Sequence, residues 1–274
     1  MRFPWDKQLT KEQKRFWEEN GYLVLAGLFQ PDEVQAVNQI VDRVVKDPKA
    51  AGNATIDVIH GPYVGKRFRA AETPLEALNG PIKINDLFLE LPEVRHLALN
   101  KRLTGILSEL MDGAPMVCNS LNFMWGSQQP DHFDTWYMPP PVENKLAVSS
   151  ICLEDVLPEA GPLVYYPGTH KIPPYRFSHG GIHAINEEMP ACRAYVEEQL
   201  QKTKASRLEF IGKAGDVFLW HGQLLHGGTP IRDLKQTRKT LVTHYWRAQD
   251  VEPERVAKMG RKAFYLIREH QATA

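Results

Sequence analysis

Hydrophobic and polar positions follow two different spacings along the chain. Over the first 114 residues the apolar positions recur every three or four residues, which is the spacing of helices with one buried face. This spacing predicts a short helix ending near Gly21, a second helix starting at Pro31, and two more at about 92–99 and 100–111. The first helix also has a start signal, because a capping-box sequence begins at Thr10. The N-terminal part of the chain is therefore expected to be mostly helical.

Short apolar runs separated by proline and glycine turns replace this spacing over about 116–246, and such runs are typical of strands. A further run at 22–25 predicts a buried strand. The tract 47–80 is polar and irregular. An insertion at about 172–205 is expected to contain a helix near 190–203.

The order of these elements predicts the fold class. Helices first and many short strands later favour a mainly β protein, in which helices support a jelly-roll core by packing against one of its sheets. We expect one domain over 1–274, with helical support at 1–114 and the β core at 115–250. The C-terminal segment 251–274 is expected to form a last helix at about 252–268.

Composition and charge exclude several classes of protein. The 274 residues carry 33 basic and 33 acidic side chains, and the basic ones are scattered, so nucleic acid is not an expected partner. No apolar run reaches the roughly 20 residues that span a bilayer, and the start of the chain lacks the apolar part of a signal peptide. Cys118, Cys152 and Cys192 are too few and too widely spaced for a disulfide framework. We expect a cytoplasmic monomer or homodimer that does not bind membranes.

Candidate chemistry centres on His132-Phe133-Asp134. Side chains two residues apart on an extended strand point to the same side, so an imidazole and a carboxylate can reach one metal ion. An isolated His-x-Asp is a common chance pattern, and the motif needs a third ligand, for which His226 is the best candidate. Two histidines and one carboxylate on one face of an octahedron leave three positions open, as in non-haem Fe(II) oxygenases.

A second histidine competes with His226 for this role. His221 and His226 are five residues apart, so on one straight strand they face opposite sides. His226 directly precedes Gly227-Gly228, which permits a turn and a close backbone approach. We therefore expect His226 to be the ligand and His221 to be a core or supporting group, although a bulge at Gly222 would place both on one face.

Several ordered motifs resemble the phytanoyl-CoA dioxygenase family of Fe(II)/2-oxoglutarate-dependent oxygenases, and the resemblance covers nearly the whole chain. The segments that carry it are Phe16 to Leu25, His132-x-Asp134, Gly161-Pro162-Leu163, Pro167-Gly168-Thr169-His170, Gly215-Asp216, His226-Gly227 and Arg238-Lys239. The resemblance implies a double-stranded β-helix, a cupin-like jelly roll. It also implies Fe(II) held by His132, Asp134 and His226, with 2-oxoglutarate and O2 as cosubstrates.

The resemblance further implies that 2-oxoglutarate binds the iron through its 2-oxo group and one carboxylate. Its far carboxylate then needs a cation, and the planar fork of arginine suits that role. Arg238 matches the family's arginine on the strand after the distal histidine. Arg232 and Lys239 lie nearby and solvated charges are common at strand starts, but Arg232 would fall in a turn, so Arg238 is favoured.

Four further positions are candidates for the pocket. Ser120 and Asn122 share one strand face, and the resemblance implies that this face contacts the cosubstrate or the substrate. Trp136 and Tyr137 fit either a pocket wall or the protein core.

A group of basic residues at Lys66, Arg67 and Arg69 could meet an anionic substrate, although a solvated loop is the favoured interpretation.

The expected function is oxidation of a small-molecule metabolite or natural-product intermediate, most simply hydroxylation of an unactivated C–H bond. Succinate and CO2 would form from 2-oxoglutarate. Halogenating relatives carry a small residue in place of Asp134, so a carboxylate there favours hydroxylation or a related oxidation. One alternative is a non-catalytic jelly-roll protein that binds a metal or small ligand. Another is a metal hydrolase or isomerase, which has no need of a carboxylate clamp such as Arg238.

Overall fold

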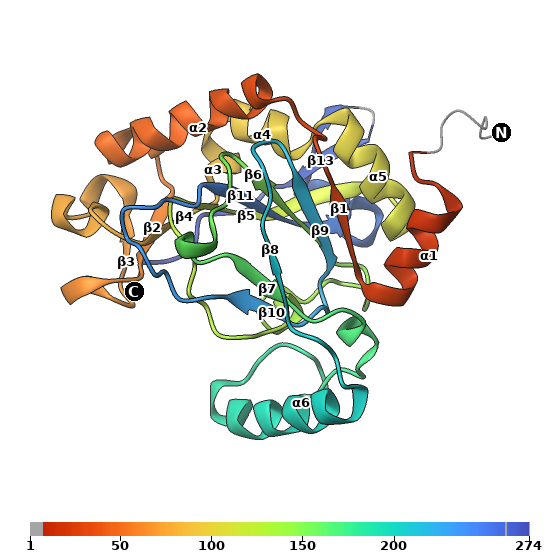
Figure 1. The fold of residues 1–274 in the computed structure, drawn as a ribbon. Helices are drawn as coiled ribbons and strands as arrows, with labels where there is room; N and C mark the ends of the chain where they lie inside the picture. Colours follow the sequence, from red (N-terminus) through yellow and green to blue (C-terminus); the bar gives the residue numbers. More distant parts are fainter. Residues whose placement is uncertain (1–7, 261, 274) are drawn as a thin grey trace.

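The fold is built on two largely antiparallel β-sheets (Figure 1). The computed structural model describes residues 8–260 and 262–273. The larger sheet has the order β1-β9-β6-β11-β5-β4-β2-β3, and the smaller sheet has the order β10-β7-β8. Their bounds are β1 (Tyr22–Leu25), β2 (Thr55–Val58), β3 (Arg67–Arg69), β4 (Ile82–Asn85), β5 (Pro115–Phe123), β6 (Ala147–Cys152), β7 (Leu163–Tyr165), β8 (Leu208–Phe210), β9 (Val217–His221), β10 (His226–Gly228) and β11 (Thr240–Arg247). From β5 onward the chain passes between the two sheets, so the predicted jelly-roll class is confirmed.

A hydrophobic core fills the space between the two sheets. Phe123, Phe218 and Trp220 enter it from the larger sheet, and Leu163 and Tyr165 enter it from the smaller one. The face of the larger sheet that carries these aromatic side chains is called the inner face below.

Helices cover the opposite face of the larger sheet, as predicted (Figure 1). Their bounds are α1 (Lys11–Asn20), α2 (Pro31–Lys46), α3 (Leu87–Glu90), α4 (Pro92–Ala98) and α5 (Lys101–Met111). The capping box at Thr10 is present at the start of α1. Val37 and Val41 of α2 share one buried cluster with Ile151 and Leu241 of the sheet. This outer face is therefore packed against the helices.

The alternation of side chains along β11 determines what can reach the space between the sheets. His244 lies opposite Asn119, Val242 lies opposite Leu121, and Val242 belongs to the core between the sheets. Side chains directly opposite in an antiparallel pair lie on the same face. The even-numbered residues of β11 therefore point inward, and the odd-numbered residues point toward the helices.

The structure corrects the prediction for the C-terminal segment. Residues expected to form a helix at about 252–268 instead form β12 (Val256–Gly260) and β13 (Ala263–Leu266). These strands pair with each other, and β13 also runs parallel to β5. Phe264 of β13 packs against the buried Met116 and Leu266, so tertiary pairing overrides local helix preference.

The tract 47–80 also contains more regular structure than its polar sequence indicates. It includes β2 and β3, which extend the larger sheet beyond β4. These strands are four and three residues long, and each has charged side chains on the inner face of the sheet, where Arg67 pairs with Asp57. The hydrophobic pattern was therefore too weak to reveal them.

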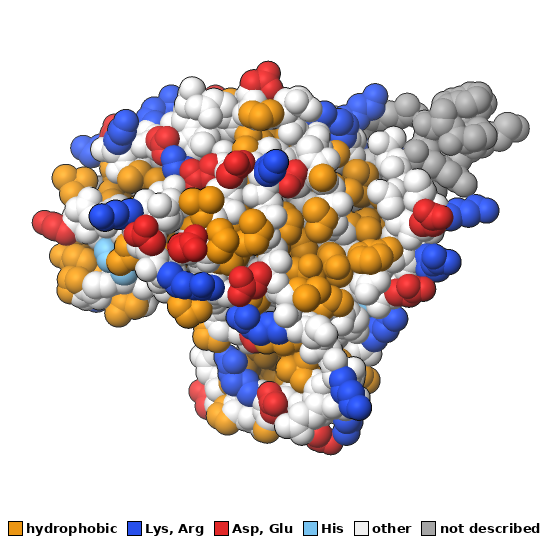
Figure 2. All heavy atoms as spheres, viewed as in Figure 1, with side chains coloured by type: hydrophobic (Ala, Val, Ile, Leu, Met, Phe, Trp, Pro, Cys, Tyr) orange, Lys and Arg blue, Asp and Glu red, His pale blue; other side chains and the backbone are white. Residues whose placement is uncertain are grey.

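The predicted insertion helix is confirmed as α6 (Met189–Thr203), which Figure 1 shows below the smaller sheet. On the face drawn in Figure 2, positive and negative side chains are interspersed around apolar ones and do not merge into one basic area. Among the described residues, no helix is long and apolar enough to cross a membrane. The three cysteines are buried and free.

Candidate metal centre

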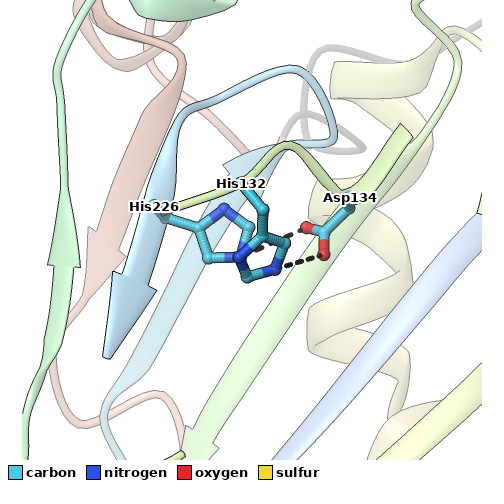
Figure 3. Close-up of side chains that lie close together, drawn as sticks. All are labelled: His132, Asp134 and His226. Carbon is cyan, nitrogen blue, oxygen red and sulfur yellow. Dashed lines mark ion pairs between the residues drawn. The ribbon is translucent and has the colours of Figure 1, made fainter. Parts of the chain in front are cut away.

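His132, Asp134 and His226 converge between the two sheets (Figure 3). His132 forms an antiparallel bridge with His226 at the start of β10, and each backbone amide donates to the other residue's carbonyl, at 2.8 and 3.1 Å. Asp134 begins the short 3-10 helix η6 (Asp134–Trp136), which turns its carboxylate toward both rings. The ligand atoms of the three side chains lie within 4.8 Å of one another, and all three residues are buried.

Both imidazole rings are oriented by the backbone. His132 Nδ1 lies 2.9 Å from the carbonyl oxygen of Pro130, and His226 Nδ1 lies 3.0 Å from that of Leu224. A carbonyl oxygen can only accept, so each Nδ1 must carry the proton. The Nε2 lone pairs are then directed toward Asp134. A donor hydrogen bond at one ring nitrogen and a free lone pair at the other is the usual arrangement of a metal-binding histidine.

The charge states also suit a cation. Burial lowers the pKa of His132 to about 3, and the neighbouring His226 acts in the same direction, so His132 is neutral at pH 7. Burial alone would raise the pKa of Asp134, but His226 and His244 outweigh it and hold the pKa below its usual range. The centre therefore presents the neutral imidazole of His132 and the carboxylate of Asp134 beside the ring of His226.

The separations between these atoms fit a metal ion better than a hydrogen-bonded triad. His132 Nε2 lies 3.8 Å from Asp134 Oδ1, and His226 Nε2 lies 3.6 Å from Asp134 Oδ2. Both distances exceed a hydrogen bond. Three donor atoms that face one another without bonding leave a place for a shared cation, and this donor set is the one typical of non-haem Fe(II).

Two residues that sequence reasoning missed hold the Asp134 carboxylate. Trp220 Nε1 donates to Asp134 Oδ2 at 2.7 Å, and His244 Nε2 lies 3.1 Å from Asp134 Oδ1. Both side chains are buried. Because the carboxylate oxygen accepts, the proton of His244 must lie on Nε2. One signal was available for His244, which is an even number of residues after Arg238 and therefore on the same strand face.

His221 lies away from the centre. Its Nε2 is 3.3 Å from the carbonyl oxygen of Asn144, and its Nδ1 accepts the backbone N–H of Gln223 at 3.1 Å. Its ring neighbours are Trp17 and His170. The structure thus gives His221 a packing role at the end of β9.

Arg238 is a buried cation that forms no ion pair with any residue that the structure describes. Only 5% of its surface is exposed, and its Nε has no hydrogen-bond partner among the described residues. Burial lowers the pKa of Arg238 to about 10, and no carboxylate opposes this effect. Thr240, two residues later and on the same strand face, also has an unpartnered buried hydroxyl. Uncompensated buried charge is strongly unfavourable, so this corner suits an anionic ligand. Arg232, by contrast, is exposed.

Ser120 and Asn122 are not brought to the centre, which corrects the expectation for them. Ser120 lies opposite Thr243, and its hydroxyl accepts the backbone N–H of Phe88 in α3 at 3.4 Å. Asn122 lies between Ile84 and Leu241 on the helix-covered face. The two residues share a face as expected, but it is the outer one. A shift of one residue exchanges the two faces of a strand, and this is the error that the sequence could not reveal.

The two aromatic residues after Asp134 have different roles. Trp136 is buried and packs with Phe133, Cys192 and Val196 under α6. Tyr137 is half-exposed, and its ring centroid lies 5.7 Å from that of His132. Trp136 therefore belongs to the core, whereas Tyr137 lies beside the metal centre.

Comparison with known proteins agrees with this geometry. The jelly roll with a buried two-histidine, one-carboxylate centre defines a class of mononuclear metal proteins. Residues 17–240 match the family model of phytanoyl-CoA dioxygenase (PhyH). The chain therefore belongs to the phytanoyl-CoA dioxygenase family, as its motifs predicted.

Two curated relatives show how far the sequence of this chain has diverged from characterised family members. The ectoine dioxygenase of Stutzerimonas stutzeri is 29% identical over 57% of this chain and 48% of its own length. The peroxisomal phytanoyl-CoA dioxygenase of Mus musculus is 24% identical over 80% of this chain and 63% of its own. The chain thus spans about half to two thirds of the length of these relatives.

Solved structures share the fold. The 2-oxoglutarate-dependent carbocyclase SnoK from nogalamycin biosynthesis superposes with a TM-score of 0.66 at 19% identity, covering 96% of this chain and 98% of SnoK. EctD from S. alaskensis, solved with 2-oxoglutarate and 5-hydroxyectoine, superposes with a TM-score of 0.62 at 18% identity, covering 91% of this chain and 80% of EctD. At these identities the likeness establishes the architecture alone.

Proposed function

We propose that this protein is an Fe(II)/2-oxoglutarate-dependent dioxygenase that oxidises a small molecule, most simply by hydroxylating an unactivated C–H bond. The observation that carries the proposal is the combination of a buried two-histidine, one-carboxylate centre with an uncompensated buried arginine on the same inner face. Family membership and the proteins named above support it.

His132, Asp134 and His226 would hold Fe(II), and the backbone carbonyls behind the two rings keep both Nε2 lone pairs available. Trp220 and His244 fix the rotation of the carboxylate. When bound, iron with 2-oxoglutarate and O2 supplies the oxidising power and yields succinate and CO2. The chain contributes ligands, orientation and exclusion of water.

Arg238 would hold the far carboxylate of 2-oxoglutarate, and the Thr240 hydroxyl is available to the same group. The match is one of charge, because an anion relieves the cost of burying the guanidinium. A non-catalytic metal-binding protein would gain nothing from keeping this charge buried. The full donor set and the arginine are both present, so the catalytic interpretation is favoured.

The proposal is tested by incubating purified protein with Fe(II), ascorbate, 2-oxoglutarate and air and measuring succinate. Slow uncoupled succinate formation is expected even without the substrate, and it should stop in Asp134→Ala. Screening metabolite mixtures by mass spectrometry for products one oxygen heavier would then identify the substrate. Equal succinate formation by wild type and Asp134→Ala would refute the assignment.

A further inference from the structure

The inner face of the larger sheet continues past the smaller sheet. The smaller sheet reaches only as far as the His132 segment, whereas the larger one continues from β5 through β4, β2 and β3. Lys83 of β4 lies opposite Phe123 of β5 on one side and Asp57 of β2 on the other. Asp57 lies opposite Arg67 of β3. Directly opposite residues share a face, and Phe123 lies in the inner core, so all of these side chains are on the face of the metal centre.

Two cations on this extension share one carboxylate. Arg67 contacts Asp57 through Nε at 2.5 Å and Nη2 at 2.9 Å, and Lys83 Nζ contacts Asp57 Oδ2 at 2.8 Å. Arg67 and Lys83 keep 29% and 24% of their side-chain surface exposed, so a ligand can reach both side chains. Among the described residues, Lys83 has no second ion pair and Arg67 Nη1 has no hydrogen-bond partner. Donors therefore remain available.

The C-terminal segment adds a third cation to this wall. Arg268 Nη2 contacts Asp86 Oδ2 at 2.6 Å, and Asp86 Oδ1 accepts from Asn119 Nδ2 at 3.0 Å. His270 Nε2 lies 2.6 Å from Glu90 Oε1, so the segment after Arg268 continues beside the end of α3. In these ion pairs three cations face two carboxylates, so one positive charge is uncompensated. We call Arg67, Lys83 and Arg268 the cationic wall.

The cationic wall is connected to the metal centre through β5. Asn119, which donates to Asp86, lies opposite His244, and His244 contacts the metal-binding carboxylate. Lys83 lies opposite Phe123, four residues further along the same strand. At about 3.3 Å per residue the wall therefore begins at the level of the metal and extends about 13 Å from it.

Asn85 is buried directly behind Asp57. Its Nδ2 donates to Asp57 Oδ1 at 3.0 Å, while its Oδ1 is buried without a partner among the described residues. This amide oxygen is therefore an unsatisfied buried acceptor behind Asp57.

We propose that the cationic wall is a substrate subsite for an anionic group, a carboxylate or a phosphate, and that the substrate extends from it to the metal centre. The inference rests on the proposed function, because it assigns a substrate class to that site. Arg67 and Lys83 bind the charged end through their free donors, and Arg268 with Asp86 closes the side nearest the metal.

The subsite is tested by ligand-observed NMR with three matched probes: hexanoate, hexyl phosphate and the neutral hexanamide. The protein is loaded with Zn(II) and saturating 2-oxoglutarate, so that the Arg238 corner is already filled and no turnover occurs. Both anions are expected to bind at least about tenfold more tightly than the amide, the effect of one charge-assisted hydrogen bond. The tighter of the two anions identifies the preferred acidic group.

Lys83→Gln leaves the two contacts between Arg67 and Asp57 in place and should reduce the preference for anions to less than about threefold. Lys66→Gln is the matched control, because Lys66 is exposed, directly precedes Arg67 in the chain and should change nothing. The subsite is refuted if hexanamide binds as well as the acids, if no probe binds, or if Lys83→Gln and Arg67→Gln both retain the preference. Failure of the proposed function is distinguishable from failure of the subsite, because it would appear as absence of succinate in the turnover assay of the wild type.

Discussion

Replacing Arg238 by methionine should change stability and cosubstrate binding in opposite directions. Burial lowers the pKa of Arg238 from its ordinary value to about 10, and this shift corresponds to about 3 kcal/mol for keeping the charged guanidinium in the fold. The full cost is present at pH 7, where the group is protonated both folded and unfolded. Methionine has a similar volume and no charge, so the 2-oxoglutarate-free variant should be more stable than wild type by up to about 3 kcal/mol.

The same substitution should remove most of the affinity for 2-oxoglutarate. Losing one partner of a buried charge pair costs about 3–5 kcal/mol, which is over a hundredfold in the dissociation constant. Urea unfolding with and without 2-oxoglutarate and Zn(II) measures both effects in one experiment. Wild type should be stabilised by the cosubstrate, whereas Arg238→Met should begin more stable and respond little.

Arg232→Met is the control for this experiment, because Arg232 is exposed and lies only six residues away. It should behave as wild type in both measurements. The reasoning is refuted if Arg238→Met is clearly less stable without ligand and still gains the wild-type stabilisation from 2-oxoglutarate. That result would mean that another group of the protein already compensates the charge of Arg238, so that Arg238 does not bind the anion.

Three further predictions concern the metal centre. His226→Ala should abolish the visible absorption of the anaerobic Fe(II)–2-oxoglutarate complex, whereas His221→Ala should retain it; the reverse result would exchange the two roles. His244→Phe should weaken the binding of Mn(II) by about 10–100-fold, because the Asp134 carboxylate loses a hydrogen-bond donor. The affinity is measured by electron paramagnetic resonance, and an unchanged value would show that Trp220 alone is enough to orient the carboxylate. The metal-free protein should lose stability as the pH falls from 6.5 toward 3, by up to about 1.4 kcal/mol per pH unit. The reason is that the pKa of His132 is about 3 in the folded protein and 6.5 in the unfolded chain, so the unfolded chain binds the proton first. Urea midpoints that do not vary over this range would contradict the protonation state assigned to His132.

The sequence was most informative where one motif carries its own geometry. His132 and Asp134 are only two positions apart in the sequence, and the positions of His226 and Arg238 followed from ordered motifs around them. The capping box of α1 and the apolar stripe of α2 were equally local, and both are present. Such features depend on neighbouring residues, which a single sequence displays directly.

Features that depend on the register between strands could not be predicted from the sequence in this way. The expectation for Ser120 and Asn122 identified a shared face but not which side of the sheet it meets, because that choice depends on Thr243 and Leu241 far along the chain. Trp220 is separated from Asp134 by 86 positions, and nothing local indicates their hydrogen bond.

The packing of α6 has a consequence for how the enzyme can vary. Cys192 and Val196 of this helix share a core with Phe133 and Trp136, the residues on either side of the metal-binding carboxylate. The insertion and the loop carrying Asp134 therefore form one cooperative unit, and neither can loosen without exposing the apolar side chains of the other. A change in the insertion would thus alter the rigidity of the iron site as well as the shape of its surroundings. A substitution in the insertion therefore has to preserve the surface of α6 that supports the loop.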